Sequence, residues 1–146
     1  MRARTRARGR ALQLLYAWES RGAADPPTRR LEGFLAERRL APEVRAYLER
    51  LIGAVAEHRT EIDRALVDSL TNWRLERLAS IDRNILRIAA AEMLYIADVP
   101  PRVSIQEAIL LAERFGSKES PRFVNGVLDA LMRESERAGN GGSEGS

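Results

Sequence analysis

The 146-residue sequence contains no cysteine and a single histidine, His58. The absence of cysteine excludes a disulfide scaffold, a thiolate zinc site and a cysteine nucleophile. Gly-rich phosphate loops, nucleophile elbows and paired metal-binding helix motifs are also missing. Glu57, His58 and Glu61 lie close together on one predicted helix, but a di-metal bundle needs a second set with its own histidine. The sequence therefore predicts a protein that is not an enzyme and has neither cofactor nor metal.

Long apolar runs are missing too. No stretch approaches the roughly 20 residues needed to cross a bilayer, and the charged N-terminus is not followed by the apolar region of a secretory signal. The apolar share of 45% is too high for a disordered chain and ordinary for a globular one. We expect one cytoplasmic domain without a membrane partner.

Lysine is nearly absent, and the positive charge is unevenly placed. Lys118 is the one lysine beside 23 arginines, and the formal net charge is +3. Residues 1–10, here called the arginine head, carry five arginines and no acid, so the remainder of the chain is at −2. Like charges four residues apart repel on a helix, and a bound polyanion would remove that repulsion. The alternative is a frayed terminus that only aids solubility. The head arginines are Arg2, Arg4, Arg6, Arg8 and Arg10.

The sequence predicts an all-α fold with about seven helices in two small bundles packed together. Val, Ile and Thr are sparse, and no segment alternates apolar and polar residues as a strand does. We expect a single domain over 1–137, with bundles at about 1–70 and 72–137, and a flexible Gly-rich tail at 138–146. The expected helices cover about 5–21, 28–39, 42–70 with a bend at Gly53 or within 57–61, 73–78, 80–97, 104–115 and 120–137.

Local signals mark several helix ends. Ser104 and Glu107 fit a capping box, Gly116 is suited to end that helix, and Ser120 with Pro121 fits the N-cap and first position of the next. A glycine inside the last predicted helix, Gly126, is costly and predicts a close approach of two helices.

The segment 116–126 combines basic side chains with an aromatic ring near a helix N-terminus. Lys118 and Arg122 add charge where backbone N–H groups and the helix dipole already attract phosphate. Phe123 lies one position off the apolar stripe of its helix and could stack on an unpaired base. The alternative is a residue at the edge of the core.

Four segments carry a resemblance to a known family. Residues 80–92 read Ser-Ile-Asp-Arg-Asn-Ile-Leu-Arg-Ile-Ala-Ala-Ala-Glu, and residues 99–109 read Val-Pro-Pro-Arg-Val-Ser-Ile-Gln-Glu-Ala-Ile. Residues 123–129 read Phe-Val-Asn-Gly-Val-Leu-Asp, and Ala-Leu-Gln-Leu-Leu-Tyr-Ala-Trp at 11–18 follows the arginine head. In order and spacing, residues 4–133 resemble the NusB family of bacterial transcription antitermination factors.

The resemblance implies a non-catalytic RNA-binding adaptor made of two three-helix bundles. Such a protein pairs with NusE, a small-subunit ribosomal protein, and binds the boxA element of nascent ribosomal RNA within the RNA polymerase antitermination complex. It also implies that Asp82 faces the partner or the RNA and accepts a hydrogen bond. The residues that the resemblance assigns to RNA are Arg4, Arg6, Arg8, Ser117, Lys118, Glu119, Arg122 and Phe123.

Two other functions stay open at this point. The chain could be a helical dimerisation or interaction module with weak or vestigial RNA binding, since some NusB-like proteins self-associate as a homodimer. A NusB-like domain also heads certain ribosomal RNA cytosine methyltransferases, and that activity would need a Rossmann-type domain downstream.

Overall fold

The computed structural model describes residues 2–144, with side chains as far as Gly139. Seven α-helices and one short 3-10 helix make up this part of the chain, which contains no strand, so the predicted all-α fold is confirmed. The elements are α1 (Arg2–Ser20), α2 (Thr28–Ala36), α3 (Pro42–Glu57), α4 (Arg59–Ser69), η1 (Leu75–Arg77), α5 (Ser80–Tyr95), α6 (Pro101–Phe115) and α7 (Ser120–Glu144).

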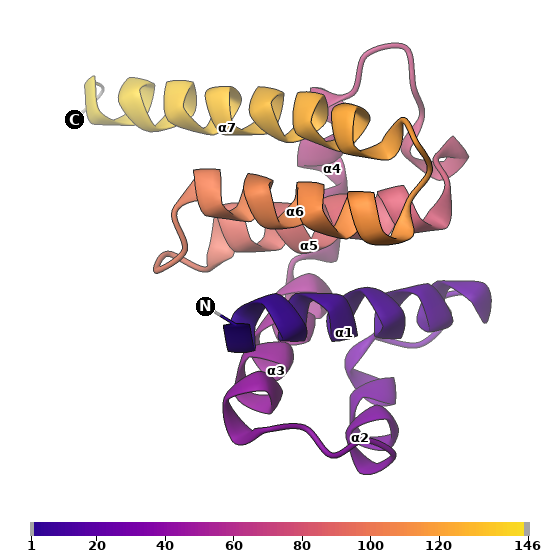
Figure 1. The fold of residues 1–146 in the computed structure, drawn as a ribbon. Coiled ribbons are helices and arrows are strands. Elements are labelled where there is room, and N and C mark those ends of the chain that lie inside the picture. The colour runs from indigo at the N-terminus through magenta and orange to yellow at the C-terminus, as the bar shows by residue number, and fades with distance from the viewer. Residues whose placement is uncertain (1, 145–146) are drawn as a thin grey trace.

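The helices form two layers, with α1–α3 in the lower one and α4–α7 in the upper one (Figure 1). Helix α1 packs on α3 within its own layer and on α5 across the interface, and α4 packs on α5 and α7. By these contacts α4 lies with the upper layer, although it comes before residue 70 in the chain. One hydrophobic cluster nevertheless runs through both layers.

The long helix predicted over 42–70 is broken in two. The break is at His58, whose backbone (φ −116°, ψ 23°) ends α3 and precedes α4. It falls inside the segment 57–61, one of the two places where a bend was expected. The His58 ring stacks on Tyr95 with a centroid separation of 3.7 Å, which ties the break to the end of α5.

Helix α5 is the centre of the molecule, as its largely apolar sequence predicts. Ile85, Leu86 and Ile88 are among its fully buried side chains. The charged Arg87 is buried on the same helix because Glu19 of α1 and Asp63 of α4 both accept hydrogen bonds from it, at 2.7 and 2.9 Å. Such pairing is what allows a cation inside a core.

The predicted capping box at Ser104 is wrong. Helix α6 begins three residues earlier, at Pro101, which suits a first helical position because proline has no N–H to satisfy. Ser104 is consequently buried inside the helix, and Glu107 pairs with Arg8 instead of reaching back. The expected end of α6 at Gly116 is confirmed by its N–H, which donates to the carbonyl of Ala112.

Helix α7 differs from the prediction at three places. Its start at Ser120 puts that residue inside the helix, where the hydroxyl accepts a hydrogen bond from the N–H of Ser117. A Cβ on Gly126 would meet no atom within 4 Å, so no close helix contact explains that glycine. The helix continues to Glu144 through most of the segment 138–146 predicted as a tail; residues 145–146 lie outside the described part of the chain. No helix among the described residues has both the length and the apolar character to span a membrane.

Candidate nucleic-acid interface

Arg8 is buried, in contrast to the role that the sequence assigned to it. Its side chain crosses from α1 to the upper layer, where Nε donates to Glu92 at 2.7 Å and Nη1 donates to Glu107 at 2.6 Å. Thr5 also donates to Glu107, and the Tyr47 hydroxyl donates to Glu92. Arg8 is 2% exposed and both its partners are carboxylates, so it fastens α1 to α5 and α6 with its charge already neutralised.

Arg4 lies at the rim of the same cluster and is engaged differently. Its guanidinium contacts the Asp98 carboxylate at 2.7 Å and lies over the Tyr47 ring. Arg50 contacts the second oxygen of that carboxylate at 2.9 Å. The guanidinium groups of Arg50 and Arg4 hold the pKa of Asp98 well below its usual range. Arg4 remains 35% exposed, so an external anion can reach it but competes with Asp98.

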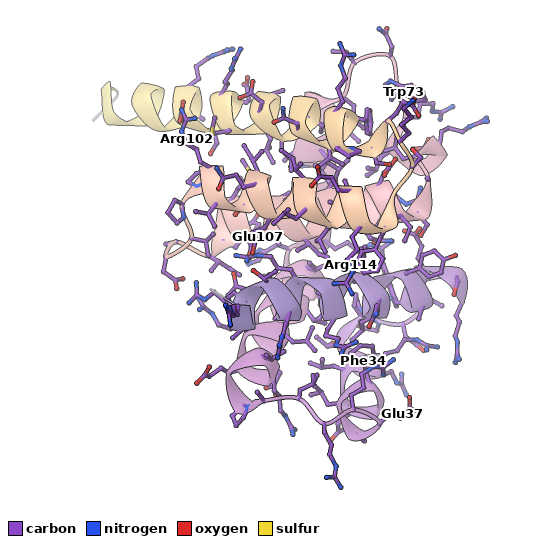
Figure 2. The ribbon with its side chains drawn as sticks, viewed as in Figure 1. Phe34, Glu37, Trp73, Arg102, Glu107 and Arg114 are labelled. Carbon is purple, nitrogen blue, oxygen red and sulfur yellow. The ribbon has the colours of Figure 1, made fainter. Side chains whose placement is uncertain are left out.

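Arg6 and Arg10 face a cavity instead. The cavity has a volume of about 380 Å³ and lies between α1, α6 and the segment that joins α2 to α3. Arg114 reaches it from α6, and in Figure 2 this side chain and Glu107 both point from α6 toward α1. Arg39 reaches it from the α2–α3 segment. We call this space the α1–α6 cavity.

The α1–α6 cavity is strongly cationic. Its lining includes Arg6, Arg10, Arg39 and Arg114, and none of these four forms an ion pair within the described residues. Glu107, the one carboxylate in the lining, is already paired with Arg8. Sequence analysis missed Arg39 and Arg114 because arginine is abundant throughout the chain. A cluster of uncompensated guanidinium groups in a concave surface favours an anionic ligand.

The loop between α6 and α7 continues from the rim of this cavity. Ser117, Lys118 and Glu119 are exposed in this loop, and Arg122 is exposed in the first turn of α7. The loop is tightly built at Gly116, where a Cβ would lie 2.5 Å from the Cβ of Ser120, so only glycine fits. The fold thus presents Lys118 and two polar groups on a short, fixed turn, with Arg122 on the helix that follows it.

Phe123 is partly buried at the core edge and has an aromatic neighbour that sequence analysis did not identify. Trp73 meets its ring edge to face, with centroids 5.8 Å apart and planes at 70°. Trp73 is 59% exposed and lies beside the start of α7 (Figure 2). A shallow groove of about 490 Å³, the Trp73 groove, includes both rings, Arg122 and Gly126. The signal in the sequence is a tryptophan at the start of the segment 73–78, which the sequence predicts as a short helix.

Asp82 lies half-buried in the first turn of α5. Its Oδ1 is enclosed but has no hydrogen-bond partner among the described residues. A buried carboxylate oxygen without a donor is unfavourable until a donor is supplied. The position is therefore compatible with a hydrogen bond from another molecule, as the resemblance implies.

Comparison with known proteins places the chain in a family. The model of the NusB family matches residues 5–133. The transcription antitermination protein NusB of Sorangium cellulosum is 45% identical over 131 residues, which are 90% of this chain and 92% of that protein. The NusB of Anaeromyxobacter dehalogenans is 47% identical over 130 residues, 88% of this chain and 89% of its own.

Solved structures agree. The T. maritima NusB structure superimposes with a TM-score of 0.82 at 36% identity, covering 90% of this chain and 91% of that one. A chain from a crystal structure of antitermination factors NusB and NusE in complex with double-stranded RNA gives a TM-score of 0.81 at 27% identity, covering 92% and 98%. The chain described here belongs to the NusB family.

Proposed function

We propose that this chain is a transcription antitermination factor, a non-catalytic RNA-binding adaptor that pairs with NusE and binds the boxA element of nascent ribosomal RNA. Its NusB relatives carry the name of transcription antitermination proteins, and a similar NusB chain has been crystallised with NusE and RNA. The adaptor would act in the cytoplasm, as a part of the RNA polymerase antitermination complex.

The observation that carries this proposal is a set of cationic and aromatic groups that is continuous along the chain, because Phe115 lines the α1–α6 cavity and Glu119 lines the Trp73 groove. Exposed Arg6 and the α1–α6 cavity lead to the α6–α7 loop, and that loop leads to the Trp73 groove. Guanidinium groups bind phosphates, and exposed aromatic rings stack on bases that are not paired. Because a single strand offers both, it is the form of RNA that suits this surface.

The roles within this surface follow from exposure. Arg6, Lys118 and Arg122 are exposed cations for phosphates, while Ser117 and Glu119 are exposed groups that can hydrogen-bond base edges. Arg4 joins them only when a phosphate displaces Asp98. Phe123 and Trp73 supply the stacking rings. We assign no RNA contact to Arg8.

The partner contact is proposed at Asp82. Its enclosed Oδ1 lacks a donor within the described residues, and a hydrogen bond from NusE would satisfy it. Replacing Asp82 with asparagine keeps the shape but removes the charge. We expect that change to weaken NusE binding and to leave the affinity for RNA alone unchanged.

The test is a fluorescence-anisotropy titration of boxA RNA against a scrambled RNA of equal length, with and without NusE. We expect a preference for boxA that NusE increases. Trp73→Ala should weaken boxA binding by about 5- to 150-fold, because stacking contributes roughly 1–3 kcal/mol per base. Tyr16→Ala is the matched control, since it removes another exposed ring, on α1, that lines neither the α1–α6 cavity nor the Trp73 groove.

Two results would contradict the proposal. If both RNAs bound equally and the affinity depended only on the salt concentration, the surface would bind RNA through charge alone, without sequence recognition. No binding even in the presence of NusE would favour the alternative of a dimerisation module, which sedimentation of the chain alone would then have to show as a homodimer.

A further inference from the structure

Gly9 has no structural explanation within the fold. It lies in the middle of α1, where glycine is less favourable than alanine or any other ordinary helix residue except proline. A Cβ at this position would meet nothing within 4 Å, so no neighbouring helix requires its absence. Gly9 does line the α1–α6 cavity, where the missing side chain leaves the backbone of α1 open to a ligand.

We propose that the α1–α6 cavity holds one unpaired base of the bound RNA, with the adjoining phosphates on the arginines of its rim. This inference rests on the proposed function and adds to it a base-binding pocket beside Gly9 and a phosphate contact at Arg39.

The chemistry of the lining suits a nucleotide. Leu40, Ala41, Val44 and Leu111 give the cavity an apolar part. Phe115 lies beside them, and the Arg114 guanidinium is 5.0 Å from its ring centroid. RNA-binding proteins stack splayed-out bases on such aromatic rings and guanidinium planes. The volume of about 380 Å³ lies within the range of roughly 300–1,000 Å³ typical of ligand pockets.

The charges restrict the ligand further. Five arginines line the cavity, and the one carboxylate in its lining is already neutralised by one of them, Arg8. The other four form no ion pair within the described residues. A free phosphate would contact the arginines but leave the apolar lining uncovered. An uncharged ring would cover the apolar lining but leave the arginines without an anion. A nucleotide within a strand has a flat ring between two phosphates and matches both.

Arg39 extends the RNA surface to the α2–α3 segment. It is exposed at the rim and forms no ion pair within the described residues. Its neighbour Arg38 is different, because it lies over the Phe34 ring, donates to the Phe34 carbonyl and contacts Glu37. The two arginines therefore form a matched pair of which only one faces the cavity.

Filling the cavity without changing its charge tests the base-binding site. Gly9→Leu places a side chain where there is open space, and it improves helix propensity, so the fold should persist. We expect boxA RNA to bind about 5- to 150-fold more weakly to this variant, which is the loss of one stacked base. Gly33→Leu is the control, because Gly33 is an exposed helix glycine with equally open space and lies outside the cavity lining.

Two further measurements identify what enters the cavity. In a set of boxA RNAs that each lack one base, one position should weaken binding to the wild type but not to Gly9→Leu. Arg39→Ala should reduce the slope of log K against log salt by about 0.7, the value for one lost phosphate contact, whereas Arg38→Ala should not.

These measurements distinguish a failure of the base-binding site from a failure of the proposed boxA-binding function. If the wild type prefers boxA but Gly9→Leu binds as well as Gly33→Leu, the cavity does not hold a base and the proposed function stands. If every missing base has the same effect in both proteins, the base-binding site is likewise refuted. If the wild type shows no preference for boxA, the proposed function fails and this inference fails with it.

Discussion

Replacing Arg8 with methionine should destabilise the fold, whereas the same change at Arg6 should not. Arg8 is 2% exposed and donates to Glu92 and Glu107, which are 1% and 8% exposed. Methionine fills a similar volume but leaves two buried carboxylates without their cation. Breaking a buried ion pair by removing one partner costs about 3–5 kcal/mol. That is a large part of the roughly 5–15 kcal/mol that stabilises a domain.

The assay is urea denaturation followed by far-UV circular dichroism at pH 7. We expect Arg8→Met to lower the free energy of unfolding by about 3–5 kcal/mol and Arg6→Met to change it by less than about 0.5 kcal/mol. Adding Glu92→Gln to Arg8→Met should restore part of the loss. The second change removes an unpaired buried charge, while the new amide oxygen can still accept from Tyr47.

The opposite pattern would refute this reasoning. If Arg8→Met and Arg6→Met were equally stable and both weakened RNA binding, Arg8 would act at the surface, as the sequence alone suggested. The reasoning would also be refuted if adding Glu92→Gln destabilised the Arg8→Met protein further. That result would mean that the Glu92 carboxylate is not an unpaired charge when Arg8 is absent.

Three more changes have expected results. Burial raises the pKa of Glu19, but hydrogen bonds from its arginine and serine partners outweigh it and lower the pKa to about 2, so stability should fall by up to about 3 kcal/mol as the pH drops from 4.5 toward 2. The urea midpoint of the Glu19→Gln variant should change less with pH over that range than the midpoint of the wild type. Asp98→Asn should release Arg4 and strengthen RNA binding in an anisotropy titration. Gly126→Ala should raise the melting temperature, because the position is helical and open and alanine is favoured by about 1 kcal/mol.

Helices were predictable where an apolar stripe repeats over several turns. The stripe of α1 and the largely apolar α5 correspond to helices that bury those same residues. Helix ends were less predictable, because several local patterns compete for the same residues. Ser104 and Glu107 fit a capping box in the sequence, but Pro101 begins the helix earlier and Glu107 is needed by a residue 99 positions away. No local pattern contains that information.

The division of the arginine head was partly readable from the sequence. Arg8 is three residues before Ala11 and four before Leu12, so it lies on the buried face of α1. The i,i+4 spacing of the head arginines predicts repulsion between like charges, but it does not distinguish Arg8, on the buried face, from the exposed arginines. What the sequence could not show was the presence of Glu92 and Glu107 opposite Arg8, since those residues come from two other helices.

The salt dependence of RNA binding distinguishes the arginine head from the wider surface. Five head arginines acting together would give a slope of roughly −3.5 for log K against log salt, and without buried Arg8 the head can give only about −2.8. Arg39, Arg114, Lys118 and Arg122 are exposed beyond the head, and their full participation would bring the slope to about −5.6. A slope steeper than −3.5 therefore requires cations from other elements, and replacing Arg39 and Arg114 together should reduce it by about 1.4. A slope near −2.8 that this double change leaves unaltered would confine RNA binding to the N-terminal helix. It would also show that the concave shape between α1 and α6 has no part in it.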